Sequence, residues 1–444
     1  MQPRAQRGGP EATRAEGPRF QSQSRLNDAQ AKAERSGLLK ERHEPAFTRR
    51  LDGIEGLRGV AAGTVVIYHV WTDNIRAGGS DLGLAGKYLF SNLGQGVTLF
   101  FALSGFLLYL PFVSAALRGR PRPSFSAYLR NRALRILPAY WFILLATALV
   151  LRSAYDNAGH VGAISDPSLL LRNATLTQNY SRSTASTGIG PAWSLAVEVV
   201  FYLALPVLVL LAVKLSTRAL TRRARRLLLM VPAAFLGIVG LTGAIVGGKV
   251  GGSLDLSFLA YADLFSLGMA LAVLRVEHEE GLLSLPRHWR PLAVATSLAI
   301  AAAAISLGHN PHLPERSETH LMAIPCALLL ALVVLPSSTR RSYLTRFLES
   351  TPVVAAGLAS YSVYLWHKPI ILFLAKHGLS PHGGSAALAG GLLTVSVITG
   401  ILSWLTYRYI EKPPLRFKAK SRRPLNAAPD ASQPDAARPV AVNP

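Results

Sequence analysis

The sequence contains about ten apolar blocks, each about 17–25 residues long, which is the length that a helix needs to cross a bilayer. A soluble protein of this size would have shorter apolar runs with a 3.6-residue alternation of polar residues. We therefore expect an all-α fold, a polytopic bundle of about ten transmembrane helices in one membrane domain. The predicted spans are 57–73, 94–116, 136–152, 192–213, 227–247, 257–276, 291–307, 319–336, 354–375 and 385–407.

Basic residues are placed unevenly along this chain, which has a net charge of +23. They gather before the first block and in alternate loops, such as 117–135 and 214–226, each with six Lys and Arg. Since short basic loops stay in the cytoplasm, we expect both termini there and the protein in the plasma (inner) membrane. The same distribution argues against nucleic acid as a partner, because no soluble face carries the charge.

The two ends of the chain differ in composition from the apolar region. Residues 1–50 are polar and are expected to be a disordered basic tail, and the Pro-, Ala- and Asp-rich residues 417–444 a second one. The folded domain is predicted to be 51–416, with no cleaved signal peptide and no second folded domain. One cysteine, Cys326, leaves no disulfide within the chain, and no metal site is expected.

The first predicted span contains an arginine and a histidine, Arg58 and His69, separated by ten mostly apolar residues. This spacing brings the two side chains to nearly the same helix face, roughly 16 Å apart along the axis. Ionisable side chains inside a membrane are costly and are functional candidates for that reason. The pair suits a site that holds an anionic group near the surface and transfers protons deeper. The alternative is structural, with Arg58 reaching lipid headgroups and His69 hydrogen-bonded between helices.

The fourth predicted span opens with Trp193 and then places Ser194, Glu198 and Tyr202 four residues apart, on one helix face. A carboxylate inside the membrane must pair, become protonated or face water. Glu198 is therefore either a functional group or the packing partner of an arginine elsewhere in the bundle.

Three arginines, Arg130, Arg132 and Arg135, precede the third predicted span, and the last two share a face. Guanidinium groups hold phosphate oxygens through paired hydrogen bonds. The cluster lies at the predicted cytoplasmic mouth, where nucleotide-type cofactors are available. Ordinary anchoring to anionic lipid is the alternative.

The ninth predicted span carries His367 and Lys368 near its middle, with Tyr364 one turn earlier. In the sixth, Asp263 lies in an apolar setting, and Asp263 and Lys368 are candidate charge partners. In the second, the small pair Ser104-Gly105 predicts a close approach of two helices.

Motifs of most soluble enzyme classes are missing from the sequence. It contains no G-x-S-x-G elbow, P-loop, H-E-x-x-H pair or dinucleotide-binding glycine pattern.

Seven stretches together resemble a known family. They are RLDGIEGLRGVAAGTVVIYHV at 50–70, FFALSGFLL at 100–108, RNRALRILPAYW at 130–141, PAWSLAVEVVFYLALP at 191–206, ADLFSLGMALA at 262–272, SYSVYLWHKPI at 360–370 and YRYIEKPP at 407–414. In this order they resemble the acyltransferase-3 family of bacterial integral-membrane O-acyltransferases. Each motif alone is weak, but seven in order form a specific signal.

The resemblance implies transfer of an acyl group, often acetyl, from a coenzyme A thioester to a hydroxyl. Acceptors in the family include cell-envelope sugars and secondary metabolites such as macrolides. The resemblance also implies that His69 is catalytic and that Arg58 is essential. Some members carry a hydrolase-like domain after the membrane part, which this chain is not expected to have.

A mechanism follows as a hypothesis. Acyl-CoA approaches from the cytoplasm, and Arg58, Arg130, Arg132 and Arg135 hold its phosphates. His69 is the general base, because the unperturbed pKa of histidine lies near neutrality. Glu198 either orients His69 or binds the acceptor, no metal is required, and the supporting residues are Trp193, Ser194, Tyr202, Asp263, Tyr364 and His367. The competing hypothesis is a proton-coupled transporter or flippase, because buried ionisable residues also build proton relays.

Overall fold

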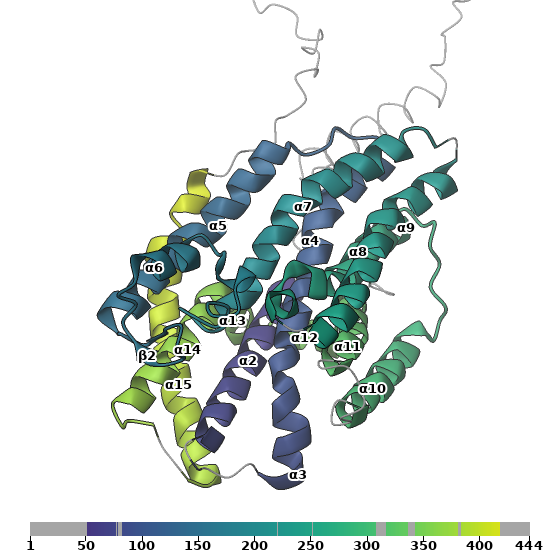
Figure 1. The fold of residues 1–444 in the computed structure, drawn as a ribbon. Helices are drawn as coiled ribbons and strands as arrows, with labels where there is room; N and C mark the ends of the chain where they lie inside the picture. The colour runs from purple at the N-terminus through teal and green to yellow at the C-terminus, as the bar shows by residue number, and fades with distance from the viewer. Residues whose placement is uncertain are drawn as a thin grey trace, which may run out of the picture. The chain divides into compact units, whose positions relative to one another are not determined.

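The computed structural model describes residues 51–417, with gaps at 77, 79–81, 220, 251, 308–316, 336–341 and 381–382. The predicted tails 1–50 and 417–444 lie outside the described residues, apart from Phe417. Figure 1 shows a bundle of helices, which confirms the predicted all-α fold.

The α-helices are α2 (Ile54–Arg76), α3 (Gly83–Ala85), α4 (Gly96–Leu117), α5 (Phe125–Leu145), α6 (Pro167–Ala174), α7 (Ala192–Ser216), α8 (Arg222–Val250), α9 (Ala262–Glu279), α10 (Trp289–Leu307), α11 (Ser317–Val334), α12 (Tyr343–Leu348), α13 (Thr351–Leu358), α14 (Ser360–Lys376) and α15 (Ser385–Thr406). Two short strands, β1 (Ala154–Tyr155) and β2 (Val161–Gly162), pair antiparallel. Short π turns span Gly86–Phe90, Ala146–Val150 and Tyr407–Glu411, and 3-10 turns span Ser91–Gln95, Gln178–Tyr180, Gly252–Leu256, Phe258–Ala260 and Pro414–Phe417.

Within the described residues, 7 helical segments are long and apolar enough to cross a membrane. They are Tyr88–Leu117, Phe125–Val150, Ala192–Ser216, Arg222–Gly247, Trp289–Leu307, Ser317–Val334 and Ser385–Phe417. Helices α2, α9 and α14 are outside this set, because α2 and α9 contain several charged residues and α14 is short. Two of these three helices, α2 and α14, carry the histidines and the lysine singled out by the sequence.

Two differences between the predicted and observed helix boundaries affect the residues of the site. Helix α5 begins at Phe125, so Arg130, Arg132 and Arg135 lie on the helix itself and not in the loop before it. Ser124 caps this early start, since its hydroxyl accepts a hydrogen bond from the Ala127 backbone N–H. The ninth predicted span is divided into α13 and α14, which meet at Ala359.

Glycines set the distance between α2 and the chain segments that pack on it. A Cβ atom on Gly56 would lie 2.2 Å from the carbonyl oxygen of Leu348, and one on Gly357 would lie 1.8 Å from that of Glu55. Only glycine therefore permits this contact between α2, α12 and α13. The contact places Arg58 beside the start of α14.

Helices α4 and α9 approach each other in the same way. A Cβ on Gly105 would lie 2.1 Å from the carbonyl oxygen of Phe265, and one on Gly268 would lie 2.0 Å from that of Ala102. The close helix approach predicted from Ser104-Gly105 is confirmed.

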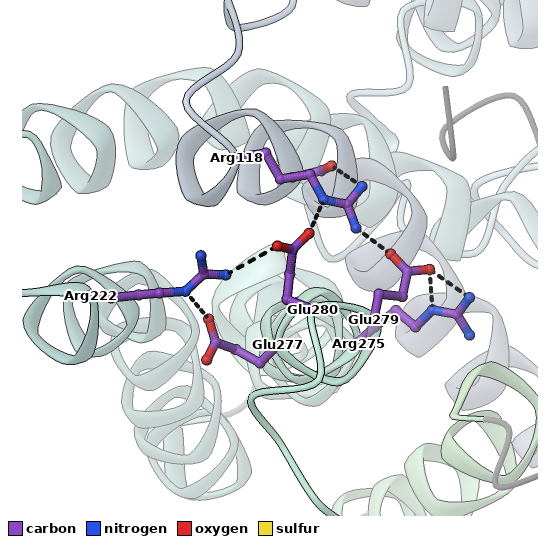
Figure 2. Close-up of polar contacts among 7 residues, drawn as sticks. Arg118, Arg222, Arg275, Glu277, Glu279 and Glu280 are labelled. Carbon is purple, nitrogen blue, oxygen red and sulfur yellow. Dashed lines mark hydrogen bonds and ion pairs between the residues drawn. The ribbon is translucent and has the colours of Figure 1, made fainter. Parts of the chain in front are cut away.

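An ion-pair network joins the ends of α4, α8 and α9 (Figure 2). It consists of Arg118–Glu279 at 2.6 Å, Arg118–Glu280 at 2.7 Å, Arg222–Glu277 at 3.4 Å, Arg222–Glu280 at 4.0 Å and Arg275–Glu279 at 2.6 Å. Burial alone would lower the pKa of Arg118, but its hydrogen bonds to Glu279 and Glu280 outweigh burial and raise it. Each arginine in this network therefore lies within 4.0 Å of at least one glutamate carboxylate.

Candidate active site

A cavity of about 100 Å³ lies between α2, α4, α5, α7 and α14. One side is apolar, with leucine and phenylalanine side chains of α4. Its polar lining comes from all five helices: Arg58, Ser104, Arg132, Arg135, Ser194, Glu198, Tyr202, Ser360, Tyr361 and Tyr364. Eight of these residues were singled out in the sequence, and folding brings them together from five helices.

The arginines of the cavity differ in their partners. Arg58 donates to the Ser360 hydroxyl from Nε at 3.3 Å and from Nη2 at 3.2 Å, and its Nε lies 3.9 Å from Glu55. Among the described residues, no carboxylate oxygen lies within 4.0 Å of the guanidinium nitrogens of Arg132 or Arg135. The Arg132 Nε is buried and has no hydrogen-bond partner among the residues that the structure describes. Arg130 is exposed and does not line the cavity.

Glu198 is the carboxylate of the cavity wall. It accepts a hydrogen bond from the Ser104 hydroxyl and another from Tyr202. It also interacts electrostatically with Arg58 and Arg132 at longer range. Among the hydrogen bonds of the described residues, none joins Glu198 to His69, whose Nδ1 lies near Val65 and His367 instead.

Tyr364 forms the wall between this cavity and a pair of histidines. Its hydroxyl is 2.7 Å from the Ser194 hydroxyl and donates to the Pro191 carbonyl at 3.0 Å. Its ring centroid lies 5.9 Å from that of Phe100 on the cavity side and 5.8 Å from that of His367 on the other. One side chain therefore contacts both parts of the site.

His69 and His367 meet directly behind Tyr364. The His367 Nε2 lies 3.1 Å from the His69 Nδ1, and the two ring centroids are 4.9 Å apart. The His69 Nδ1 is also 3.0 Å from the Val65 carbonyl oxygen, and the His367 Nδ1 is 3.2 Å from that of Val363. His69 is partly buried and His367 is fully buried. His69 does not line the cavity, although Arg58, about three turns away on the same helix, does.

The pairing of Asp263 with Lys368 is wrong. Lys368 Nζ lies 3.6 Å from Asp73 on α2, and Asp263 lies 2.7 Å from the His320 Nδ1 on α11. The reason is that Asp263 stands at the first turn of α9, beside α11, whereas Lys368 belongs to the helix that packs on α2. Trp193 packs against Tyr261 at 5.0 Å between ring centroids and is not part of the cavity wall.

Three residues of the site had no sequence signal of their own. Only the structure reveals them, through their contacts with other residues. Ser360 accepts a hydrogen bond from Arg58, Asp73 pairs with Lys368, and Glu411 accepts a hydrogen bond from Ser362. Ser360 and Glu411 do lie inside stretches of the family resemblance, which is the one clue that the sequence offered. Within the described residues, no group of three His, Cys, Asp or Glu side chains is arranged to hold a metal ion.

Comparison with known proteins identifies the family of this chain. A family model described as an acyltransferase domain matches residues 51–408. The chain belongs to this acyltransferase family. Its apolar helices make it a multi-pass membrane protein.

Individual relatives are distant. O-acetyltransferase OatA of Staphylococcus aureus is 23% identical over 396 residues, which cover 82% of this chain and 57% of OatA. A putative peptidoglycan O-acetyltransferase of Bacillus subtilis, YrhL, is 24% identical over 86% of this chain and 58% of its own length. Acyltransferase MdmB of Streptomyces mycarofaciens is 25% identical over 88% of this chain and 98% of its own length. The chain thus spans less than two thirds of OatA and YrhL, and no solved structure matches it.

Proposed function

We propose that this protein is an O-acyltransferase of the plasma membrane that moves an acyl group, acetyl in the first instance, from acyl-CoA to a hydroxyl. The acceptor is a carbohydrate, an envelope glycan or a secondary metabolite such as a macrolide. The name of the relative YrhL, a putative peptidoglycan O-acetyltransferase, favours the envelope glycan as the first acceptor to test.

One observation carries the proposal. A cavity lined by three arginines shares its wall residue, Tyr364, with a pair of histidines. An acyl-CoA-dependent transferase needs these two features side by side, because it must hold a phosphorylated donor and remove a proton from the acceptor. A proton-coupled transporter also uses buried titratable groups, so it is the acyltransferase relatives that favour the transferase over the transporter.

Arg58, Arg132 and Arg135 hold the donor in this proposal. Complete small-molecule sites usually have volumes of about 300–1,000 Å³, so a cavity of about 100 Å³ accepts only the narrow acyl-pantetheine end. In this proposal the donor's phosphates lie at the arginine-lined end of the cavity, and the adenosine stays outside, towards the basic loops. Among the residues that the structure describes, no carboxylate oxygen lies within 4.0 Å of the guanidinium nitrogens of Arg132 or Arg135, which supports their binding phosphate oxygens.

His69 acts as the general base. It removes the proton of the acceptor hydroxyl while that oxygen attacks the thioester carbonyl carbon. The carbon–sulfur bond of the tetrahedral intermediate then breaks, and the protonated His69 returns the proton to the coenzyme A thiolate. In this proposal the acceptor reaches His69 past Tyr364, which lines the cavity and contacts His367. Glu198 and Ser104 bind a hydroxyl of the acceptor.

The test is acyl transfer by the purified protein in lipid vesicles, supplied with radiolabelled acetyl-CoA and an extract of envelope glycans and metabolites. We expect label to reach a component of the extract with the wild-type protein and not with His69→Ala. Absence of transfer from every short acyl-CoA by a folded protein would contradict acyl-CoA as the donor. Equal transfer by His69→Ala would leave the enzyme class standing and remove His69 as the base.

A further inference from the structure

The neighbours of His69 and His367 determine which ring donates and which accepts the hydrogen bond between them. We infer that His367 is a positioning residue that fixes the tautomer of His69, so that the His69 Nε2 carries the lone pair and is the basic atom. This inference rests on the proposed role of His69 as general base. It adds the identity of the reacting nitrogen and the group that selects it.

The direction starts at His367. Its Nδ1 lies 3.2 Å from the Val363 carbonyl oxygen, which can only accept a hydrogen bond. The Nδ1 therefore carries the hydrogen. In a neutral imidazole the other nitrogen is then an acceptor, so the His367 Nε2 presents a lone pair to His69.

Because the His367 Nε2 is an acceptor, His69 must donate the hydrogen bond between the two rings. Its Nδ1 lies 3.1 Å from the His367 Nε2 and 3.0 Å from the Val65 carbonyl oxygen. Both neighbours are acceptors, so the His69 Nδ1 carries a hydrogen that is shared between them. The Nε2 of His69 is left as the unprotonated nitrogen, and no hydrogen bond engages it among the described residues.

The opposite direction is unfavourable for two reasons. If His367 donated from Nε2, the lone pair of the His69 Nδ1 would face the Val65 carbonyl oxygen at 3.0 Å. In addition, His367 would either lose its hydrogen bond to Val363 or become a cation. His367 is fully buried and is followed by Lys368, so an added positive charge there would be costly.

The arrangement matters most when His69 has accepted the proton of the acceptor. The imidazolium then donates from Nδ1 to Val65 and His367, and from Nε2 to the leaving thiolate. His367 performs the orienting role for which Glu198 was considered, but as a neutral acceptor. Its effect is therefore expected to be smaller than that of a buried carboxylate.

Two substitutions of His367 separate the two hydrogen bonds. In His367→Gln the amide oxygen takes the place of Nε2 and continues to accept from His69, while the bond to Val363 is lost. In His367→Asn the amide nitrogen takes the place of Nδ1 and continues to donate to Val363, while the acceptor for His69 is lost. His367→Asn is smaller than His367→Gln by one methylene, so thermal unfolding of both variants is measured beside the kinetics to separate a packing defect from the loss of a hydrogen bond.

Acetyl transfer is measured for both variants, with kcat and the KM for acetyl-CoA determined separately. We expect His367→Gln to keep kcat within about threefold of wild type, and His367→Asn to lose roughly 10- to 100-fold, a part of what a general base contributes. The KM for acetyl-CoA should not change in either, because His367 does not line the arginine cavity. Equal losses of kcat in both variants, or a rise in KM, would overturn the positioning role.

A spectroscopic measurement on the wild-type protein decides the tautomer without any assay of activity. In protein labelled with ¹⁵N-histidine, the resonances that disappear in His69→Gln belong to His69. We expect a protonated Nδ1 and an unprotonated Nε2 for His69. A protonated Nε2 would overturn the inference even if acyl transfer is confirmed. The expected tautomer together with full activity of His69→Ala would instead remove His69 as the base, while the tautomer assignment and the enzyme class would stand.

Discussion

Two groups of arginines in this protein have opposite surroundings. Each arginine of the network at the ends of α4, α8 and α9 lies within 4.0 Å of a glutamate: Arg118, Arg222 and Arg275 (Figure 2). In the cavity, Arg58 has one ion pair, with Glu55, and Arg132 and Arg135 have none among the described residues. The first group is compensated within the protein, whereas we propose that Arg132 and Arg135 of the second group bind an anion from outside.

The difference teaches how to separate structural from functional arginines in a basic membrane protein. Compensated, partly exposed pairs contribute about 0–1 kcal/mol each to stability and leave no charge to offer a ligand. A buried guanidinium group without a partner is costly to the fold, and such a group is retained where it binds something. The two groups should therefore respond to substitution in opposite ways.

Loss of the base is expected to have the largest effect. His69→Ala should reduce kcat for acyl transfer about 10²- to 10⁴-fold, which is the usual contribution of general base catalysis. The thermal unfolding temperature in detergent should change little, since His69 is only partly buried. A residual rate within tenfold of wild type would mean that another group takes the proton.

Substitution of a cavity arginine should come next. Charged hydrogen bonds contribute about 1.5–3 kcal/mol, so Arg132→Gln and Arg135→Gln should each raise the KM for acetyl-CoA roughly 10- to 100-fold. Neither should lower thermal stability, because no carboxylate is left without a partner. Arg130→Gln is the matched control on the same helix, exposed and outside the cavity, and its KM should equal that of wild type. A similar rise for all three would point to general attraction by the basic surface.

Tyr364→Phe is expected to have a moderate effect. It removes the hydrogen bonds to Ser194 and Pro191 but keeps the ring between the cavity and His367. A neutral hydrogen bond contributes about 1 kcal/mol, which corresponds to a change of about fivefold in kcat. Ser194→Ala removes one of the same bonds from the other side and should give a smaller change. A loss comparable to that of His69→Ala would assign Tyr364 a direct part in the chemistry.

The network arginine should have the smallest effect on catalysis. Arg118→Gln should leave kcat and KM unchanged and lower the free energy of unfolding by about 1 kcal/mol or less. Its partners Glu279 and Glu280 keep Arg275 and Arg222, which limits the loss. The measurement is thermal unfolding in detergent beside steady-state kinetics. If Arg118→Gln raised KM as Arg132→Gln does, the distinction between the two groups would fail.

The sequence predicted the single-helix features of this site well. The spacing of Arg58 and His69 and the face formed by Ser194, Glu198 and Tyr202 follow from helix geometry, and α2 and α7 are helices as expected. The apolar blocks likewise predicted where helices lie. The start of α5 was missed because Arg130, Arg132 and Arg135 interrupt the apolar pattern that marked its later part.

The sequence could not tell which helices contact each other. His367 lies 298 positions from His69, and nothing in either span says that their rings meet. For the same reason Asp263 was paired with the wrong cation, since charge alone does not tell which helices are neighbours. Whether an arginine is compensated also depends on the position of a distant glutamate, which only the fold supplies.

The most direct test of the central claim is equilibrium binding of radiolabelled acetyl-CoA to the protein in lipid vesicles. Each of the variants Arg132→Gln and Arg118→Gln removes one positive charge from the wild type, the first in the cavity and the second in the ion-pair network. The three proteins are measured side by side. The account predicts that Arg132→Gln weakens binding at least tenfold and that Arg118→Gln binds like wild type. Equal binding by both variants, or equal loss in both, would contradict the assignment of the unpaired arginines to the donor.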